Sequence, residues 1–431
     1  MNVRYDPINS ELFVTNRKKL CKHLKTNSLA VFQSNDEMPR NGDCFFPFRQ
    51  NSDLFYLCGI DQEQTILLIF PDCPNPSYRE ILFVRKTSEK IKIWDGSKYT
   101  KKQASSTSGI KTVFWLESFD KIFRLLTKAA DSIYVNRNEH ERSNSEVDSR
   151  NLRFARQLKN QLPAHNFERA TPLVTSLREI KSSFEIELIK EACSITEKGF
   201  RRVLGYLKPG LWEYEVEAEV THEFIRNKSN GHAYNPIFAS GKSACILHYI
   251  HNNQLCKDGD LILMDFGAEY ANYASDLTRT IPVNGRFTKR QKEVYNSVRS
   301  VMVRAINMLV VGTLLDEFNK EIGKLIESEL INLKLITRTD VKKQDPKNPL
   351  FKKFFPHGTA HFLGMDVHDV GNRYSPFKPG MLLTCEPGIY IPNEGIGIRI
   401  ENDILVTKNG PVDLMSSIPI EIEEIEDLMN K

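Results

Sequence analysis

Hydrophobic and polar positions in the first third of the chain alternate in short runs that predict β-strands. The runs are apolar, β-branched or aromatic and end in turn residues; they cover 28–34, 64–70, 80–85, 111–116 and 131–136. Apolar residues between these runs recur at helical spacing, as in 117–130. Near Pro172 the pattern changes from short strand-like runs to longer helical ones. We therefore predict an α/β amino-terminal domain over residues 1–172, a usual domain size.

Longer amphipathic patterns after Pro172 predict helices in pairs. The first pattern, 182–210, has a serine N-cap in Ser182 or Ser183, acidic residues in its first turns and the sequence "KPG" at its end. Further helices are expected at 213–227, 288–309 and 315–336, and β-like runs follow each pair.

The order helix, helix, strand, strand thus occurs twice, which predicts a second domain over residues 173–431. Internal duplication is inferred only from this order of elements. The segment 337–354 is rich in lysine and proline and is predicted to be an exposed loop.

Composition and charge narrow the class of protein. The chain has 431 residues, of which 40% are hydrophobic and 26% charged, as in globular proteins. The net charge of +4 is spread along the sequence, so no nucleic-acid partner is expected. The eight cysteines form no CxxC pair and are expected to be reduced. The longest apolar run, in "TILLIF", is too short for a membrane span, so we expect a cytoplasmic protein without a membrane partner.

Two pairs of acidic residues stand in β-like runs of the second domain. Asp265 ends the apolar run "LILMD", and Asp276 stands in the next run, where a hairpin would place the two face to face. Glu386 and Glu401 repeat this arrangement near the end of the chain. An unpaired carboxylate beside a buried strand costs several kcal/mol, which predicts a bound cation.

His361 lies between these pairs in sequence and completes a candidate site for two divalent ions. Its spacing from His357, in "FFPHGTAHFLG", also matches the two histidines of a zinc-protease helix. That helix needs a glutamate directly after the first histidine, and Gly358 occupies the position. Pro356 and the glycines also weaken a helix, so we exclude this interpretation.

Several sequence motifs of the second domain resemble those of the proline-specific metallopeptidases of the pita-bread fold, most closely the aminopeptidase P family. They are "ILHY", "MDFGAEY", "YASDLTRTIPVNG", "FFPHGTAHFLGMDVHDVG", "TCEPGIYI" and "IGIRIENDILVT". In the first domain, "FPFRQNSDLFYLCGI" and "IWDGSKY" resemble the amino-terminal domain of that family. The resemblance implies an α/β (α+β) chain whose catalytic domain has an antiparallel sheet backed by helices.

The resemblance also implies a role for each site residue. Asp265 would bind one metal ion, Asp276 and Glu401 would bridge two, and His361 and Glu386 would bind the other. Glu386 would also act as general base. The remaining implied residues surround the metals without binding them: His248 and His368 hold the peptide and the oxyanion, His357 lines the pocket, and Arg399 supports a bridging carboxylate. The cofactor would be two divalent ions per subunit, with Mn²⁺ favoured over Co²⁺, Zn²⁺ or Fe²⁺.

The implied activity is release of the N-terminal residue from peptides with proline second. A prolidase that cuts only Xaa-Pro dipeptides would use the same ligands, and a metal-free pita-bread binding module or a methionine aminopeptidase are further alternatives. The peptide is the expected partner, together with further copies of the chain in a dimer or tetramer. Trp94 is expected to pack in the core or at an interface. In members of the resembled family, the motif "IWDG" that contains it can lie near a neighbouring subunit's active site.

Overall fold

The computed structural model describes residues 3–431. The chain divides into two compact units, with bounds Met1–Arg178 and Glu179–Lys431. The predicted boundary at Pro172 falls inside the helix that ends unit 1. The helices of unit 1 are α1 Glu11–Cys21, α2 Ser52–Cys58, α3 Glu89–Asp95, α4 Lys101–Ser108, α5 Phe119–Thr127, α6 Arg150–Gln161 and α7 Thr171–Arg178. Its strands are β1 Ser28–Gln33, β2 Pro39–Asn41, β3 Cys44–Phe45, β4 Ile66–Ile69, β5 Glu80–Val84, β6 Thr112–Trp115, β7 Ser132–Val135 and β8 Asn166–Arg169.

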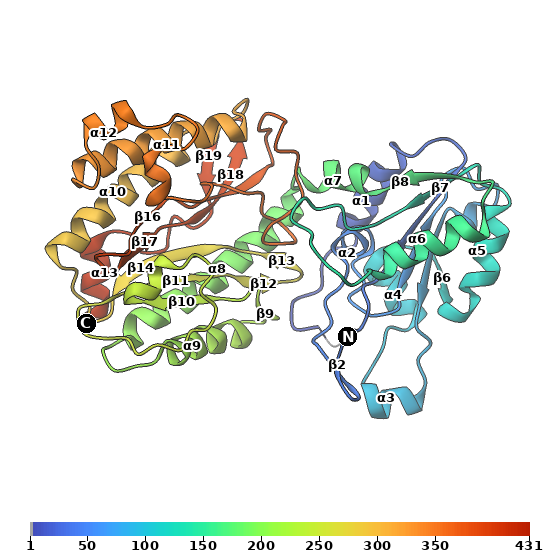
Figure 1. Cartoon of the computed structure of the whole chain (residues 1–431). Helices are drawn as coiled ribbons and strands as arrows, with labels where there is room; N and C mark the ends of the chain where they lie inside the picture. The colour runs from blue at the N-terminus through green and yellow to red at the C-terminus, as the bar shows by residue number, and fades with distance from the viewer. Residues whose placement is uncertain (1–2) are drawn as a thin grey trace. The chain divides into compact units, whose positions relative to one another are not determined.

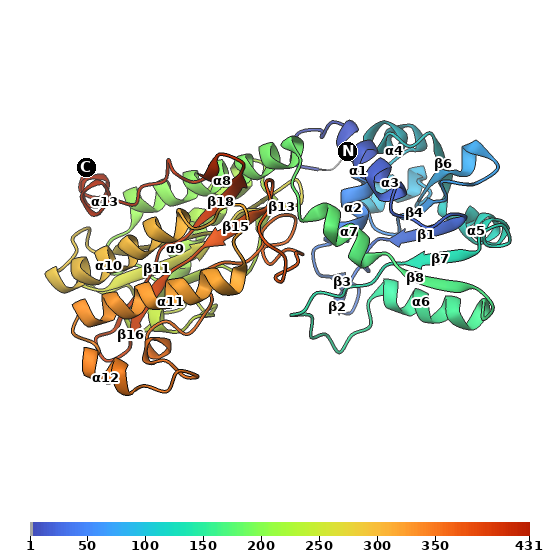
Figure 2. The same cartoon turned by 90° about the horizontal axis from the view of Figure 1, so that it is seen from above.

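A six-stranded mixed sheet in the order β6-β5-β4-β1-β7-β8 forms the centre of unit 1. Figure 2 shows β1, β7 and β8 side by side, and these three strands are parallel. Leu29 and Val31 of β1 pack with Phe123 of α5 and Leu158 of α6, while α2 packs against β1 and β4. All five predicted strands are confirmed, because each apolar run supplies a buried strand of this sheet or its partly buried edge.

Unit 2 contains two helix pairs and a set of short antiparallel sheets (Figure 1). Its helices are α8 Ser183–Tyr206, α9 Glu213–Arg226, α10 Lys289–Ile306, α11 Leu315–Asn332, α12 Arg338–Lys343 and α13 Ile422–Met429. Its strands are β9 Gly231–His232, β10 Ile237–Ser240, β11 Leu261–Phe266, β12 Ala268–Tyr270, β13 Tyr273–Ala274, β14 Leu277–Pro282, β15 Leu382–Cys385, β16 Gly388–Ile391, β17 Ile396–Arg399, β18 Asn402–Thr407 and β19 Gly410–Asp413.

Figure 1 shows the strands of unit 2 running between the pair α8 and α9 and the pair α10 and α11. One three-stranded sheet has the order β10-β11-β14 and another the order β15-β18-β19. A β-bridge between Thr278, in β14, and Glu401 joins these two sheets. The predicted order helix, helix, strand, strand is therefore present twice, and the two strand blocks meet at this bridge.

Local sequence explains the helix boundaries. Ser182 caps α8, and its side chain and that of Glu185 satisfy each other's backbone N–H groups, which confirms the predicted start. The predicted loop 337–354 was wrong in part, because α12 forms inside it. Thr337 and Asp340 make the same reciprocal cap there, which supplies the hydrogen bonds that a short exposed helix needs.

Three further sequence expectations can be compared with the structure. All eight cysteines are free thiols. Trp94, in α3, is 79% exposed, so packing in the core of its own chain was the wrong interpretation. Within residues 3–431, none of the helices combines the length and the apolar character that crossing a membrane requires.

Candidate metal centre

The four predicted acids all lie at the ends of strands in unit 2. Asp265 is the penultimate residue of β11, and Asp276 directly precedes β14. Glu386 directly follows β15, and Glu401 directly precedes β18. Because β11 pairs with β14 and β15 with β18, both antiparallel, each pair of acids lies at one end of one strand pair.

The strand register differs between the two pairs. Cys385 pairs with Asn402, so Glu386 and Glu401 face each other when that register continues. Asp265 instead pairs with Thr278, and the same continuation places Asp276 opposite Gly267. The prediction that the hairpin sets Asp265 against Asp276 was therefore wrong.

Gly267 explains how the chain comes so close at this point. A Cβ atom added to Gly267 would lie 1.7 Å from the carbonyl oxygen of Ser275, a distance that no side chain can occupy. A glycine is therefore required for the backbone before Asp276 to approach the end of β11.

The segment that carries His361 is irregular and is held against β15. Glu386 donates its backbone N–H to the Thr359 carbonyl oxygen at 2.9 Å, and Thr384 donates to the His361 carbonyl oxygen at 3.0 Å. No residue from Pro356 to Gly364 is helical, in agreement with the exclusion of a zinc-protease helix. This pairing places His361 beside Glu386.

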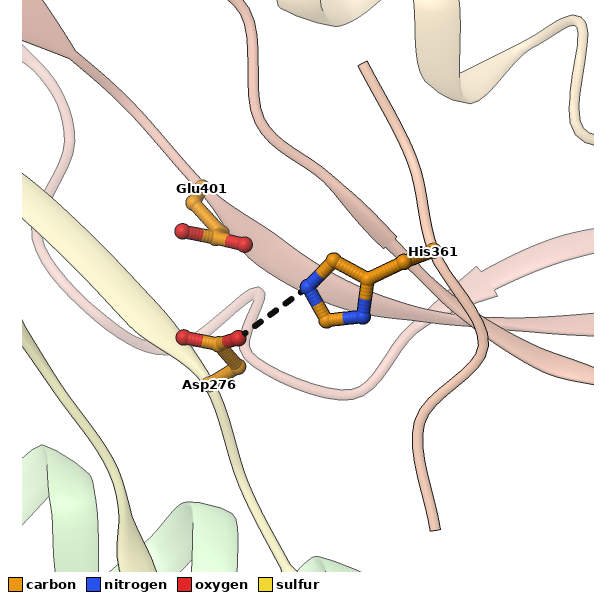
Figure 3. Close-up of side chains that lie close together, drawn as sticks. All are labelled: Asp276, His361 and Glu401. Carbon is orange, nitrogen blue, oxygen red and sulfur yellow. Dashed lines mark ion pairs between the residues drawn. The ribbon is translucent and has the colours of Figure 1, made fainter. Parts of the chain in front are cut away.

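Three of the predicted ligands converge on one point, as Figure 3 shows. Asp276, His361 and Glu401 each offer an atom, and these atoms lie within 4.8 Å of one another. His361 Nδ1 donates to the Phe362 carbonyl oxygen at 3.0 Å, which leaves Nε2 3.4 Å from Asp276 Oδ2. The same Nε2 is 3.9 Å from Glu386 Oε1. One imidazole and several carboxylates with this separation can hold a divalent cation.

Tyr234 joins Asp265 to this cluster and was missed in the sequence. Its hydroxyl lies 2.6 Å from Asp265 Oδ1 and also contacts Asp276 Oδ1. A phenol carries one proton, so the hydroxyl can make a full hydrogen bond to only one of the two carboxylates at a time. The only signal was an aromatic residue shortly before a strand, in "HAYNPIF", which does not indicate a site by itself.

Arg399 compensates part of the negative charge. Its Nη2 forms an ion pair with Asp265 Oδ2, and its Nε donates to Thr278 Oγ1 at 3.1 Å. Thr278 Oγ1 in turn donates to Glu401 Oε2 at 2.7 Å. Arg399 thus contacts Asp265 directly and reaches Glu401 through Thr278.

Burial without enough positive charge shifts the acid–base chemistry of the cluster. Burial raises the pKa of Asp276, and the charge of Asp265 adds to this. Burial likewise raises the pKa of Glu386 to about 7, and that of Glu401 to well above its usual range. Burial would lower the pKa of His361, but the Asp276 hydrogen bond and the Glu386 charge raise it to about 9. Such a set of groups favours a bound cation, so the residues fit a metal site.

The other three predicted histidines differ in their surroundings. His357 Nδ1 donates to the Gly358 carbonyl oxygen, and Nε2 accepts from the Tyr390 hydroxyl, both at 2.8 Å. Burial, assisted by the charge of Arg399, lowers the pKa of His357 to about 3, so this ring is neutral. His368 is exposed and its ring centroid is 4.5 Å from that of His361. His248 is exposed in the turn after the 3-10 helix Gly241–Cys245.

Comparisons with known proteins agree with this geometry. Family models match twice: metallopeptidase family M24 over residues 187–408 and the aminopeptidase P N-terminal domain over residues 13–134. The chain is 33% identical to Xaa-Pro aminopeptidase of Haemophilus influenzae, with 97% of both chains covered. It is 34% identical to Xaa-Pro aminopeptidase of Escherichia coli K12, with 98% of both covered.

Solved structures are similar over nearly the full length. Aminopeptidase PepP of Pseudomonas aeruginosa superposes with a TM-score of 0.89 at 31% identity, covering 98% of each chain. Proline aminopeptidase P II of Yersinia pestis gives a TM-score of 0.87 at 32% identity, covering 98% of this chain and 100% of that one.

Proposed function

The chain belongs to metallopeptidase family M24, and on that premise we propose that it is an Xaa-Pro aminopeptidase. It releases the N-terminal residue from peptides whose second residue is proline. The predicted α/β (α+β) fold, with an amino-terminal domain and a pita-bread catalytic domain, is confirmed by the aminopeptidase P structures. The observation that carries the activity is the convergence of Asp276, His361 and Glu401, within the M24 region of a chain whose full length matches Xaa-Pro aminopeptidases.

We propose that two divalent ions, most simply Mn²⁺, are held by all five predicted ligands. Asp276 and Glu401 would bridge the ions, Asp265 would complete one position, and His361 with Glu386 the other. The spacing of Asp276, His361 and Glu401 and the raised pKa values of the buried carboxyls support this assignment. When bound, such ions polarise a carbonyl group and make water more acidic.

Glu386 is proposed as the general base. Its carboxylate would accept a proton from water and give it to the leaving amine. Glu386 Oε2 lies 3.6 Å from His357 Nδ1. Because the His357 ring is neutral, it places no positive charge beside the carboxylate of Glu386.

The exposed histidines fit roles on the substrate side. We propose that His248 and His368 hold the peptide and stabilise the negative charge that develops on the scissile carbonyl oxygen. His357 accepts from Tyr390, which in turn accepts from Arg399 Nη1 at 2.8 Å. This chain of hydrogen bonds fixes the orientation of His357 between Arg399 and the base.

Specificity for proline has a chemical reason. An Xaa-Pro bond has no N–H, and the proline ring fixes φ, so general aminopeptidases cannot bind it through the usual backbone donor. Incubation with one Xaa-Pro-Xaa tripeptide and one Xaa-Pro dipeptide, each with Mn²⁺, tests the proposal. Release of the first residue from the tripeptide supports it. Cleavage of the dipeptide alone would identify a prolidase.

Metal analysis separates the enzyme from a metal-free binding module. Protein reconstituted with Mn²⁺, Co²⁺, Zn²⁺ or Fe²⁺ and passed through a desalting column is expected to keep two ions per subunit. Protein that keeps no ion and cleaves no peptide would instead be a module. A dimer or tetramer and a cytoplasmic location are also proposed; light scattering and cell fractionation test them.

A further inference from the structure

A buried ion pair fixes the loop that carries His368. Lys181 Nζ lies 3.2 Å from Asp369 Oδ2, and both side chains are only 1% exposed. Asp369 is the next residue after His368. Removing one partner of a buried pair leaves an uncompensated charge, which is strongly unfavourable, so each residue holds the other in place.

Further hydrogen bonds from backbone N–H groups hold the same region of the chain in place. Asp369 donates its N–H to the Phe362 carbonyl oxygen at 2.9 Å. Asn372 donates its N–H to Glu179 Oε1 at 2.8 Å, and Lys181 donates its N–H to the Gly380 carbonyl oxygen at 2.8 Å. The segment from Glu179 to Lys181, at the start of unit 2, therefore contacts the loop through both side chains and backbone.

Two glycines leave the space that this arrangement needs. A Cβ atom on Gly364 would lie 2.1 Å from Asp369 Oδ2 and 2.9 Å from Lys181 Cε. Gly380 has a φ of +92°, and a Cβ atom there would lie 2.9 Å from Ile180 Cγ2. Side chains at either position would push the ion pair or its supporting segment out of place.

The position of the loop matters for the site because His368 packs on a proposed ligand. The ring of His368 meets that of His361 edge-on, with centroids 4.5 Å apart and an interplanar angle of 78°. A shift of Asp369 would be passed to His368 through one peptide bond, whereas His361 is held separately by Thr384 and Phe362.

We propose that Lys181 is a positioning residue for catalysis, which holds His368 beside the substrate through Asp369. The inference rests on the proposed function, since the role of His368 is part of it. Lys181 itself does not contact the proposed ligands; it acts only through the loop.

A double-mutant cycle tests the proposal. Lys181→Met keeps the length of the side chain and removes its charge. We expect kcat/KM for an Xaa-Pro-Xaa tripeptide to fall about 10- to 100-fold, mainly in kcat, as for a misplaced catalytic group. In a His368→Ala background the same substitution should cause no further loss. Equal losses in both backgrounds would overturn the proposal.

Asp53→Asn provides a matched control. Asp53 Oδ1 forms a largely buried ion pair with Arg178 Nη1 at 2.7 Å in unit 1. Its loss should weaken folding but leave kcat/KM unchanged at a temperature where the variant is folded. Mn²⁺ affinity, measured by calorimetry, should be the same in Lys181→Met and the wild type. A weaker affinity in Lys181→Met would mean that the ion pair supports the metal site itself and would overturn the positioning role.

Hydrogen exchange keeps the test independent of the activity. The amides of Asp369 and Asn372 should exchange faster in Lys181→Met than in the wild type, while those of β11 should not. Unchanged protection of these amides would overturn the positioning role of Lys181, whether or not the wild type cleaves an Xaa-Pro peptide. A wild type that cleaves no Xaa-Pro peptide would by itself refute only the proposed function. If Lys181→Met does not fold, the pair Lys181→Met with Asp369→Leu removes both charges together and should show the same loss of His368-dependent activity.

Discussion

Metal binding to the metal-free enzyme is expected to release protons. In the metal-free protein, His361 has a pKa raised to about 9 and Glu386 a pKa raised to about 7. A metal ligand must be the neutral imidazole or the ionised carboxylate, so both groups have to lose a proton on binding. The apparent affinity should therefore rise with pH.

The magnitude follows from these two values. At about pH 7, His361 is almost fully protonated and releases about one proton, while Glu386 is half protonated and releases about 0.5. The raised pKa values of Asp276 and Glu401 can only add to this number. We expect at least about 1.5 protons per site, so the apparent Kd should fall at least about 30-fold for each pH unit near neutrality.

Calorimetry measures this number directly. Titration of the metal-free protein with Mn²⁺ in buffers of different ionisation enthalpy, at one pH, gives the protons released as the slope of observed heat against buffer enthalpy. His357→Asn is the control, because the pKa of His357 is lowered to about 3 and the ring has no proton to lose. A slope near zero, or an affinity that does not change with pH, would refute this account of the site.

Three further predictions follow from the same contacts. Glu386→Gln should abolish tripeptide hydrolysis, because the base is gone; residual activity near that of the wild type in a product-release assay would contradict the assignment. Tyr234→Phe should retain the fold but weaken Mn²⁺ binding by about tenfold, since Asp265 and Asp276 lose a shared hydrogen bond; an unchanged calorimetric Kd would count against it. His232 is buried and its pKa is lowered from 6.5 to about 4, so the unfolded state binds the proton first as the pH falls. Between about pH 6.5 and 4 the wild type should lose about 3 kcal/mol of unfolding free energy more than His232→Gln, and equal losses in urea titrations would exclude this cause.

The sequence predicted the strands and the acidic residues well because both depend on local pattern. Apolar runs bounded by turns became the sheet of unit 1, Asp265 lies one residue before the end of a buried strand, and Glu386 directly follows one, close to the predicted positions. Irregular backbone around His361 was predictable from Pro356 and Gly358. These features need no knowledge of distant residues.

Features that depend on distant residues were not predictable in this way. The contact between Tyr234 and Asp276, and the bridge between Thr278 and Glu401, join segments that only the folded chain brings together. The register that offsets Asp276 from Asp265 along the strand pair depends on the close approach at Gly267, which no propensity encodes. The exposed position of Trp94 also lies outside what aromatic character alone can indicate.

Gly267 has a consequence for the tolerance of the gene to mutation. In a scan of all single substitutions, position 267 should accept nothing but glycine, since even alanine would collide with the Ser275 carbonyl oxygen. Gly358, inside the histidine motif, is different: an added Cβ atom would meet only Asn319 Oδ1, at 3.8 Å. The more conspicuous glycine of the two is thus the sterically free one. If alanine at 358 were also rejected, the restriction would come from the approach of the peptide and not from the folded chain.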